Sequence, residues 1–375
     1  PLTLAIFNKE DLPILNYIDD DGDMIEPEFY LPVIPTVLIN GIIGIGTGFS
    51  CNIPCYDPEK ITKIYKKLLT SDDIKETLKT IKELKPHYTG HLGPIVKDGN
   101  KYISKGVYKR ILSNQIEITE LPVGTWTQDY KEFLEKCIDN PKNKLKDYDS
   151  HYTEKSIKCI LHFEPGAVND LLKFDKDSDL TKFEKEFKMT TSKLLSTTNM
   201  HMFDDKGTIT KMKNIKEIIE KFYNFRLKWY QTRKDYIIDK LKKELVILDA
   251  RIKFILDIIE ERLKINNRKR SDIEEYLEKN NNKKKNTENE GKTKESYDYL
   301  IKMPIWNLTY EKKEELLKEL NNKKDMLSAI EIKKIESMWL DDLEVFHNEY
   351  NKYLQNRLKD LDNNKNTKFK KKISK

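Results

Sequence analysis

The sequence predicts an α+β domain followed by a long antiparallel coiled coil, and three observations point to this fold class. Residues 1–166 hold 11 of the 13 glycines and 12 of the 13 prolines, so the first half must be rich in turns. In the second half, apolar residues recur at steps of three and four along a heptad-like seam, which is the period of paired helices. The chain has 38% hydrophobic and 35% charged residues, a balance that fits an elongated molecule with much solvated helix surface.

Short apolar runs bounded by turn residues predict the strands and helices of the first half. Strands are predicted at Thr36–Asn40, Tyr102–Ile103, Gln115–Thr119 and Ser156–Phe163. Amphipathic helices are predicted at Pro58–Thr70, Asp72–Leu84 and Thr127–Cys137. Together they make the first half a turn-rich α+β domain.

A long helix is predicted to begin near residue 214. Asn214 and Glu217 have the spacing of a capping box, and the apolar seam continues from there to residue 263. About fifty residues of helix reach about 75 Å, which no compact domain can bury, so the helix must pair with another. We expect the partner in the same chain, because Thr309 can cap a return helix that continues the seam. The tip of the arm is then expected near residues 264–308.

Two segments have the composition of unstructured chain. Residues 266–295 are rich in Asn, Lys and Glu, which predicts a disordered insertion at or near the tip. Residues 359–375 are predicted to form a flexible basic tail, because 363–375 hold six lysines and no acid. A solvated end and a role in nuclear import or DNA tethering both remain open for this tail.

Charge and cysteine content limit the classes of protein to which this sequence can belong. Residues 1–30 carry one lysine and eight acids, a net −7, so with a total of +6 the other 345 residues carry +13. This excess allows a nucleic-acid partner without requiring one, and a soluble lysine-rich protein would look the same. Four cysteines are too few for a disulfide framework and indicate a reducing compartment. No apolar run approaches the roughly 18 residues of a membrane helix, and the start at Pro1 without Met indicates part of a longer protein.

The most unusual segment is the glycine-rich stretch Ile39–Gly48. Four glycines in eight residues suggest a phosphate cradle, but Thr47 and Phe49 stand where the known phosphate-binding motifs need Lys and Gly. What remains is a backbone that a partner can approach closely, with isoleucines such as Ile45 displayed from it. Ile45 could be a wedge that inserts between DNA base steps, or part of a buried hydrophobic turn.

The other candidate ligands fit their motifs poorly. The acidic run Asp19–Asp23 lacks the EF-hand spacing and is expected to be a solvated turn. Cys51 and Cys55, followed by two histidines, are poorly spaced for zinc, so no metal ligand is predicted. No Ser/His/Asp arrangement stands out. Trp126, just before a predicted helix, is either a core anchor or a groove contact.

Eight sequence blocks, in a fixed order along nearly the whole chain, are recognisable. They are Ile25–Tyr30, Pro32–Pro35, Leu38–Gly41, Gly44–Gly48, Glu120–Tyr130 (ELPVGTWTQDY), Ser196–Asp204 (STTNMHMFD), Met303–Thr309 (MPIWNLT) and Trp339–Leu343. In these blocks the chain resembles the breakage-reunion region of eukaryotic-type (type IIA) DNA topoisomerase II. Bacterial gyrase is a more distant relative and lacks the last three blocks in this form.

The resemblance implies a mixed α/β tower (shoulder) domain, followed by an antiparallel coiled coil with a helical exit-gate tip. Residues 1–30 would be the end of a winged-helix domain, 31–213 the tower and 214–358 the coiled coil and exit gate. The implied enzyme is an ATP-hydrolysing homodimer that cuts both strands of one DNA duplex, passes a second duplex and reseals the break. Mg²⁺ and ATP would be bound outside this sequence, no membrane would be involved, and a cellular eukaryotic source would place the enzyme in the nucleus.

The resemblance assigns DNA-contacting residues in this sequence. They are Ile45, Gly44, Gly46, Thr47, Trp126, Lys188, Thr191 and Ser192. Ile45 matches the family's intercalating isoleucine, and the last three lie in Lys188–Asn199, which matches a DNA-contacting strand extended by a residue or two. Gly124 departs from the family, because several members have Arg at this position.

No catalytic residue is assigned. The family's nucleophilic tyrosine follows an Arg and forms a covalent phosphotyrosyl ester, and none of the 19 tyrosines here follows an Arg. We expect it upstream of Pro1, so this sequence alone would be catalytically inactive. The alternatives are a non-enzymatic coiled-coil DNA-architecture or scaffold protein, and a coiled-coil oligomerisation module without DNA.

Overall fold

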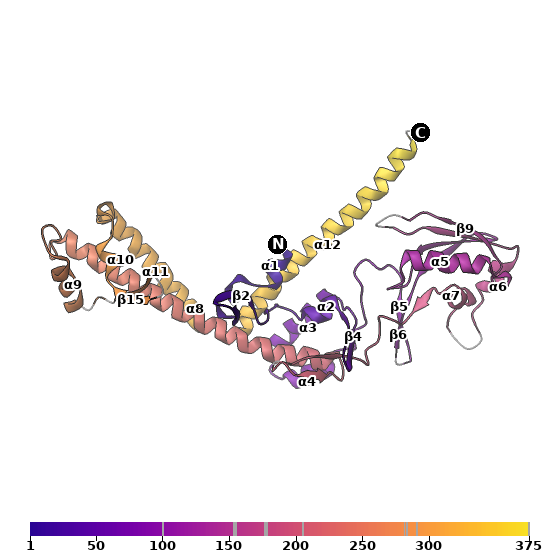
Figure 1. Ribbon diagram of the computed structural model, residues 1–375, viewed down its shortest axis with the longest axis horizontal. Helices are drawn as coiled ribbons and strands as arrows, with labels where there is room; N and C mark the ends of the chain where they lie inside the picture. The colour runs from indigo at the N-terminus through magenta and orange to yellow at the C-terminus, as the bar shows by residue number, and fades with distance from the viewer. Residues whose placement is uncertain are drawn as a thin grey trace. The chain divides into compact units, whose positions relative to one another are not determined.

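The computed structural model describes residues 1–99, 101–152, 156–175, 179–204, 206–280, 282, 284–289 and 292–373. The chain divides into two compact units (Figure 1). The first, here called the α+β unit, comprises residues 1–7, 32–226 and 342–375, and the second, the arm unit, comprises 8–31 and 227–341. Helices are mixed with sheets whose described strand pairs are all antiparallel, so the α+β class is confirmed.

The α+β unit holds most of the strands. Its helices are α1 (Leu2–Ile6), α2 (Thr36–Asn40), α3 (Pro58–Leu69), α4 (Ile74–Thr80), α5 (Thr127–Ile138), α6 (Ala167–Leu171), α7 (Lys182–Glu186), the start of α8 (Ile215–Ile259) and most of α12 (Ile335–Ile373). Its strands are β3 (Ile42–Gly46), β4 (Phe49–Ile53), β5 (Ile95–Asp98), β6 (Lys101–Lys105), β7 (Val107–Leu112), β8 (Gln115–Glu120), β9 (Leu145–Ser150), β10 (Cys159–Phe163), β11 (Thr190–Thr191), β12 (His201–Phe203) and β13 (Ile209–Lys211).

A four-stranded sheet in the order β7-β8-β10-β9 carries the main core of this unit. In β10, Cys159, Leu161 and Phe163 are all buried, as their alternation predicts. The register places Leu161 opposite Ile116 of β8. Tyr130 of α5 joins the same core cluster. A separate three-stranded sheet, β11-β6-β5, and the hairpins β3–β4 and β12–β13 carry the candidate interface.

Two elements of this unit differ from the predictions. Thr36–Asn40, predicted as a strand, is the helix α2, which begins after Pro35 and fully buries Leu38. A five-residue β-branched pattern is a weak signal that tertiary packing overrides. The helix predicted over 72–84 is shorter, because α4 begins after the capping Asp73 and ends at Thr80.

The arm unit is mainly helical. It contains the short 3₁₀ helix η1 (Lys9–Ile14), the hairpin β1 (Tyr17–Asp20) and β2 (Asp23–Pro27), the rest of α8, α9 (Arg270–Lys279), β14 (Lys285–Asn289), β15 (Lys292–Ser296), α10 (Asp298–Ile301), η3 (Ile305–Asn307) and α11 (Tyr310–Ile332). The start of α8 lies in the α+β unit, where the Glu217 N–H donates to Asn214 Oδ1 at 3.0 Å, as the predicted cap requires.

Helices α8 and α11 pack along each other in antiparallel sense (Figure 1). Lys242 of α8 forms an ion pair of 3.0 Å with Glu331 of α11, whereas Leu248, further along α8, packs in one cluster with Leu316. Residue numbers therefore rise along α8 as they fall along α11. Thr309 caps α11 by accepting the Lys312 N–H at 3.3 Å, so the predicted return helix is confirmed.

Part of the segment predicted to be disordered, 266–295, has regular structure. Helix α9 buries Ile273 and Leu277 in a cluster with Leu263, and β14 pairs with β15. The i, i+4 spacing of the two apolar side chains gives α9 a face to bury, and the Asn/Lys-rich composition conceals it. Residues 281, 283, 290 and 291 of this segment lie outside the described residues.

The compact units do not follow the predicted boundaries. Residues 8–31 belong with the arm, and 342–373 belong with the α+β unit. Asp11 and Arg233, both buried with charged atoms 3.9 Å apart, tie the first of these segments to α8. Helix α12 continues to Ile373, where composition predicts a flexible tail from residue 359; residues 374 and 375 lie outside the described residues.

Candidate nucleic-acid interface

The hairpin β3–β4 presents the predicted wedge residue next to its turn. The last strand pair is Gly46 opposite Phe49, so Thr47 and Gly48 form a two-residue turn. Ile45 lies in the adjoining pair and is 92% exposed. The alternative of a buried hydrophobic turn is therefore wrong for this residue.

The two faces of β3 differ in character. Side chains alternate along a strand, which puts Ile43 and Ile45 on one face and Gly44 and Gly46 on the other. A Cβ at Gly44 would meet no atom within 4 Å, and one at Gly46 would meet only the Phe49 carbonyl at 3.9 Å. One face is bare at Gly44 and Gly46, and the other carries the two isoleucines. Every residue of the strand is exposed, so both faces are open to a partner.

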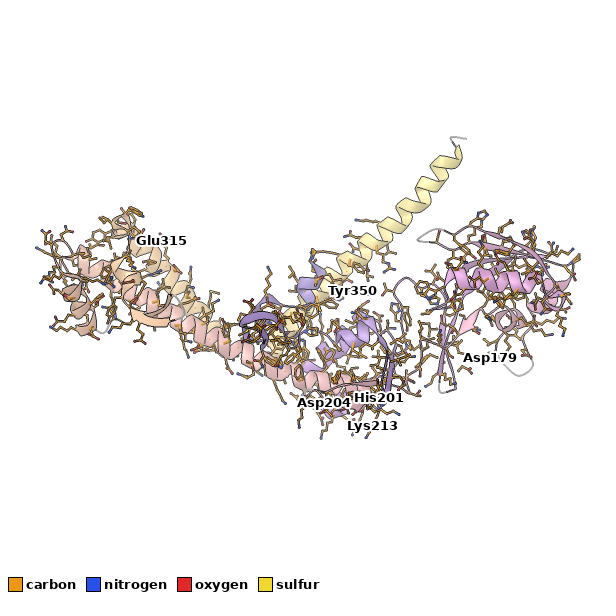
Figure 2. The ribbon with its side chains drawn as sticks, viewed as in Figure 1. Asp179, His201, Asp204, Lys213, Glu315 and Tyr350 are labelled. Carbon is orange, nitrogen blue, oxygen red and sulfur yellow. The ribbon has the colours of Figure 1, made fainter. Side chains whose placement is uncertain are left out.

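Residues 193–201 fix this hairpin along β4. The Asn52 N–H donates to the Asn199 carbonyl at 2.7 Å, and Asn52 Nδ2 donates to the Lys193 carbonyl at 3.2 Å. Asn199 Nδ2 donates to Ser50 Oγ at 2.7 Å. His201, on β12 beside the Asp204 turn (Figure 2), lies with Nδ1 3.1 Å from the Ser50 carbonyl. These bonds hold the strand opposite Ile45 while leaving its side chain free.

Trp126 precedes α5 and is 76% exposed, so it is not a core anchor. The turn before it is closed by the Thr125 N–H, which donates to the Pro122 carbonyl at 3.1 Å. Gly124 has a φ of 79°, which the third residue of a type II turn requires. A Cβ at Gly124 would lie 2.5 Å from Leu194 Cδ1, so the turn packs against the same segment that fixes the hairpin.

The predicted residues Lys188, Thr191 and Ser192 lie at the start of this segment. The Lys188 ammonium lies 4.3 Å from the ring centroid of Phe133, a residue of α5. Thr191 belongs to β11, its Oγ1 accepts the N–H two residues further on at 3.2 Å, and Ser192 is exposed. Residues 188–201 therefore link the Trp126 turn to the hairpin of Ile45.

Exposed lysines follow the same part of the chain. Lys193, Lys206, Lys211 and Lys213 are exposed, and none of them forms an ion pair with an acid of the described residues. Ammonium groups that form no ion pair are available to contact phosphate groups. Of these four, only Lys193 lies in a stretch that the resemblance matches to DNA contact, Lys188–Asn199.

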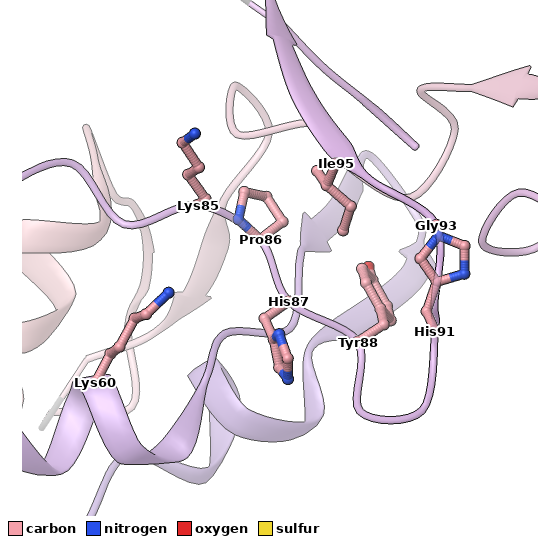
Figure 3. A pocket seen from close by; sticks show the side chains of 8 residues that line it. All are labelled: Lys60, Lys85, Pro86, His87, Tyr88, His91, Gly93 and Ile95. Atoms are coloured by element: carbon pink, nitrogen blue, oxygen red, sulfur yellow. The ribbon is translucent and has the colours of Figure 1, made fainter. Parts of the chain in front are cut away.

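A pocket of about 190 Å³ lies beside this segment (Figure 3). It is lined by Lys60, Lys85, Pro86, His87, Tyr88, His91, Gly93 and Ile95. The Tyr88 hydroxyl donates to the Leu194 carbonyl at 2.8 Å, and burial raises the pKa of Tyr88 to about 12. Tyr88 is thus a neutral hydrogen-bond donor that positions the segment.

The described residues contain no group of three or more His, Cys, Asp or Glu side chains that could hold a metal ion. Burial raises the pKa of the Cys51 and Cys55 thiols, which disfavours the thiolate form that binds zinc. The acidic run closes the β1–β2 turn, where Asp19 Oδ1 accepts the Gly22 N–H at 2.7 Å.

In the described part of the chain, no helix is both long and apolar enough to cross a membrane.

Reasoning from the sequence missed the residues that support the interface. Asn52 belongs to no motif, and its partners are distant in the sequence, so no local signal marks it. Leu194 lies within Lys188–Asn199, but nothing in that stretch marks its packing against Gly124. Asn199 lies inside the recognisable block Ser196–Asp204 and at the end of Lys188–Asn199, and these two matches are the signals that pointed toward it.

Comparison with known proteins decides the family. The family model for the A subunits of DNA gyrase and topoisomerase IV matches residues 1–344. This chain belongs to that topoisomerase family. The match, together with the relatives described next, confirms the resemblance to the topoisomerase II breakage-reunion core.

Those relatives are named DNA topoisomerase 2. The protein of Candida albicans is 33% identical over 405 residues, covering 94% of this chain and 27% of its own length. The protein of Plasmodium falciparum is 35% identical over 370 residues, covering 91% and 25%. The solved Plasmodium falciparum topoisomerase II DNA-binding, cleavage and re-ligation domain is similar with a TM-score of 0.82 and 34% identity, over 95% of this chain and 50% of that one. The chain spans about a quarter of the length of the curated relatives it matches.

Proposed function

We propose that this chain is the DNA-gate part of an ATP-dependent type II DNA topoisomerase, where it binds and bends the duplex that is cut. The observation that carries the proposal is Ile45, an apolar side chain 92% exposed on a hairpin fixed along β4. Leaving such a side chain in water is unfavourable, and inserting it between base steps removes it from water and kinks the duplex.

The lysines near residues 193–213 supply the binding energy that bending requires. Bending a site of 20–30 base pairs costs on the order of 1–6 kcal/mol. Contacts from exposed ammonium groups to phosphates offset this cost, and each contact releases a condensed counterion. Binding by this chain is therefore expected to weaken steeply with salt, with a log–log slope of about −0.9 per phosphate contact.

The rest of the cycle is proposed for the whole enzyme. It would cleave both strands of the gate duplex through phosphotyrosyl esters, pass a second duplex and religate. Mg²⁺ would assist cleavage and ATP hydrolysis would drive the gates, both bound outside the described residues, and in a eukaryotic cell the enzyme would work in the nucleus. The residues described here hold and orient the duplex, and we assign no covalent step to them.

A second copy of this chain is the proposed protein partner. Ile305, Trp306 and Tyr310 are 82%, 77% and 62% exposed in the arm unit, within and next to the block Met303–Thr309. Large apolar side chains grouped in this way mark protein contact surfaces. A two-fold dimer would bring the same surface of each copy together and would close the arm's tip as an exit gate.

Replacing Ile45 with alanine tests the bending function. A duplex labelled with an energy-transfer pair at its two ends reports the bend, and its titration reports the affinity. We expect Ile45→Ala to lower the transfer efficiency at saturation much more than it lowers the affinity, because the lysines remain. Ile332→Ala is the matched control, since this isoleucine is 84% exposed at the end of α11, outside the candidate interface.

Equal bending by the wild type and Ile45→Ala would contradict the proposed role of the hairpin. No binding of duplex DNA at low salt by the wild type would contradict the proposed function as a whole and would favour a coiled-coil oligomerisation module.

A further inference from the structure

A buried series of hydrogen bonds joins two segments of the candidate interface, the turn before Trp126 and the strand β11. Ser104 of β6 is fully buried and pairs through its backbone with Thr191 of β11. Its Oγ accepts the Val123 N–H at 3.1 Å and lies 3.0 Å from His91 Nε2. His91 Nδ1 in turn lies 3.5 Å from a carboxylate oxygen of Glu120.

The donors and acceptors fit in one arrangement. In this arrangement the Glu120 carboxylate accepts and the facing His91 Nδ1 carries the proton, which is the tautomer assigned to suit the 3.5 Å contact. The other ring nitrogen, Nε2, is then an acceptor for the Ser104 hydroxyl, because neutral imidazole has one donor and one acceptor. Ser104 Oγ keeps a lone pair for the Val123 N–H. Each of these three side chains then has a hydrogen-bonding partner. The series of contacts ends at the backbone of the turn before Trp126.

This connectivity is that of a Ser–His–acid triad, yet it cannot work as one. The Ser104 side chain is fully buried in the α+β unit, so no substrate can reach its oxygen. The His91 side chain is only 7% exposed. What such an arrangement can do is hold a turn in place, because breaking one link leaves a buried polar group unsatisfied.

We propose that Glu120, His91 and Ser104 form a positioning relay that fixes the Trp126 turn relative to β11. Ser104 is the central residue, because its side chain holds Val123 and its backbone holds Thr191. The effect on DNA binding rests on the proposed function, whereas the effect on the position of Trp126 does not. The relay acts through Trp126 and does not itself contact DNA.

The test uses the whole chain labelled with 5-fluorotryptophan. Replacing Trp126 with phenylalanine identifies its ¹⁹F resonance among those of the four tryptophans. We expect His91→Leu, which removes the acceptor for Ser104, to shift or broaden the Trp126 resonance without DNA. His91→Gln keeps an amide oxygen within reach of Ser104 and should restore the resonance.

The same variants are then titrated with duplex DNA. His91→Leu should weaken binding by the same factor as Trp126→Ala, about three- to tenfold for a lost buried hydrogen-bond partner. The double variant should be no weaker than either single variant, because both act through one contact. Tyr108→Phe is the stability control, since it removes a 3.0 Å bond to Thr181 in the same unit and should leave Trp126 unchanged.

Several outcomes would overturn the relay. An unchanged Trp126 resonance in His91→Leu would do so, as would additive losses in the double variant, or an equal resonance shift in Tyr108→Phe. If His91→Leu does not fold, Glu120→Ala supplies the same test at the half-buried end of the relay, because it removes the acceptor that faces His91 Nδ1. Absence of DNA binding in the wild type would contradict the proposed function and leave the resonance test of the relay in force.

Discussion

Replacing Gly124 with alanine probes the turn that presents Trp126. The φ of 79° at Gly124 lies in the left-handed region, where an L-residue loses roughly 1–2 kcal/mol. The added Cβ would also lie 2.5 Å from Leu194 Cδ1, and displacing that side chain adds an overpacking cost of about 1–3 kcal/mol. Leu194 is only half-buried and can partly yield, so we expect a total loss of about 2–3 kcal/mol.

Urea unfolding of the whole chain measures this loss, and a DNA titration measures its effect on the interface. Leu194→Ala, combined with Gly124→Ala, should recover the overpacking part and leave the backbone part, which a double-mutant cycle separates. A loss below about 0.5 kcal/mol, the range of ordinary surface substitutions, would refute the reasoning. So would a Gly124→Arg variant that binds DNA more tightly with unchanged stability, because the arginine of other family members would then fit this turn.

Two further predictions concern charge and assembly. The Lys109 and Lys158 ammonium groups, 2.8 and 3.0 Å from Glu117, lower its pKa below the ordinary value of 4.5. The stability that this group contributes is therefore present above about pH 4.5 and is lost as the pH falls through the lowered pKa. We expect Glu117→Gln to flatten the acid side of a plot of thermal-unfolding temperature against pH. A plot as steep as that of the wild type would contradict this. Trp306→Ala should raise the dimer dissociation constant measured by sedimentation by about tenfold or more, as for a central aromatic contact. Trp126 is similarly exposed, at 76%, but lies outside the arm unit, so Trp126→Ala should leave the dimer dissociation constant unchanged. An equal increase in the two variants would contradict the proposal that the arm unit forms the dimer contact.

Much of the fold could be predicted because its signals are local. The strand at β10, the helices α3 and α5 and the cap of α11 each depend on residues within one element. Prediction failed where neighbours in space decide. Thr36–Asn40 became a helix because Leu38 is buried in the core, and α9 forms because Ile273 and Leu277 pack against residues of other elements.

The candidate site divides in the same way. The glycine-rich stretch and the exposed isoleucine could be found in the sequence, since motif and composition mark them. The unpaired lysines could not, because a lysine's neighbours determine whether an acid neutralises it. The relay of Glu120, His91 and Ser104 could not be found either, since its members are 13 to 29 residues apart and only Glu120 lies in a recognisable block.

By itself, the sequence determined the family, the α+β class and the long paired helices. Hydrophobic periodicity, glycine placement and motif blocks are properties of the sequence alone, and they do not depend on which distant residues pack together. Only the tertiary structure decided that Ile45 and Trp126 are exposed, that residues 188–201 link them, and that residues 8–31 belong with the arm. Exposure and pairing depend on which distant residues fold against a side chain, and burial and hydrogen-bond satisfaction are settled only by that packing.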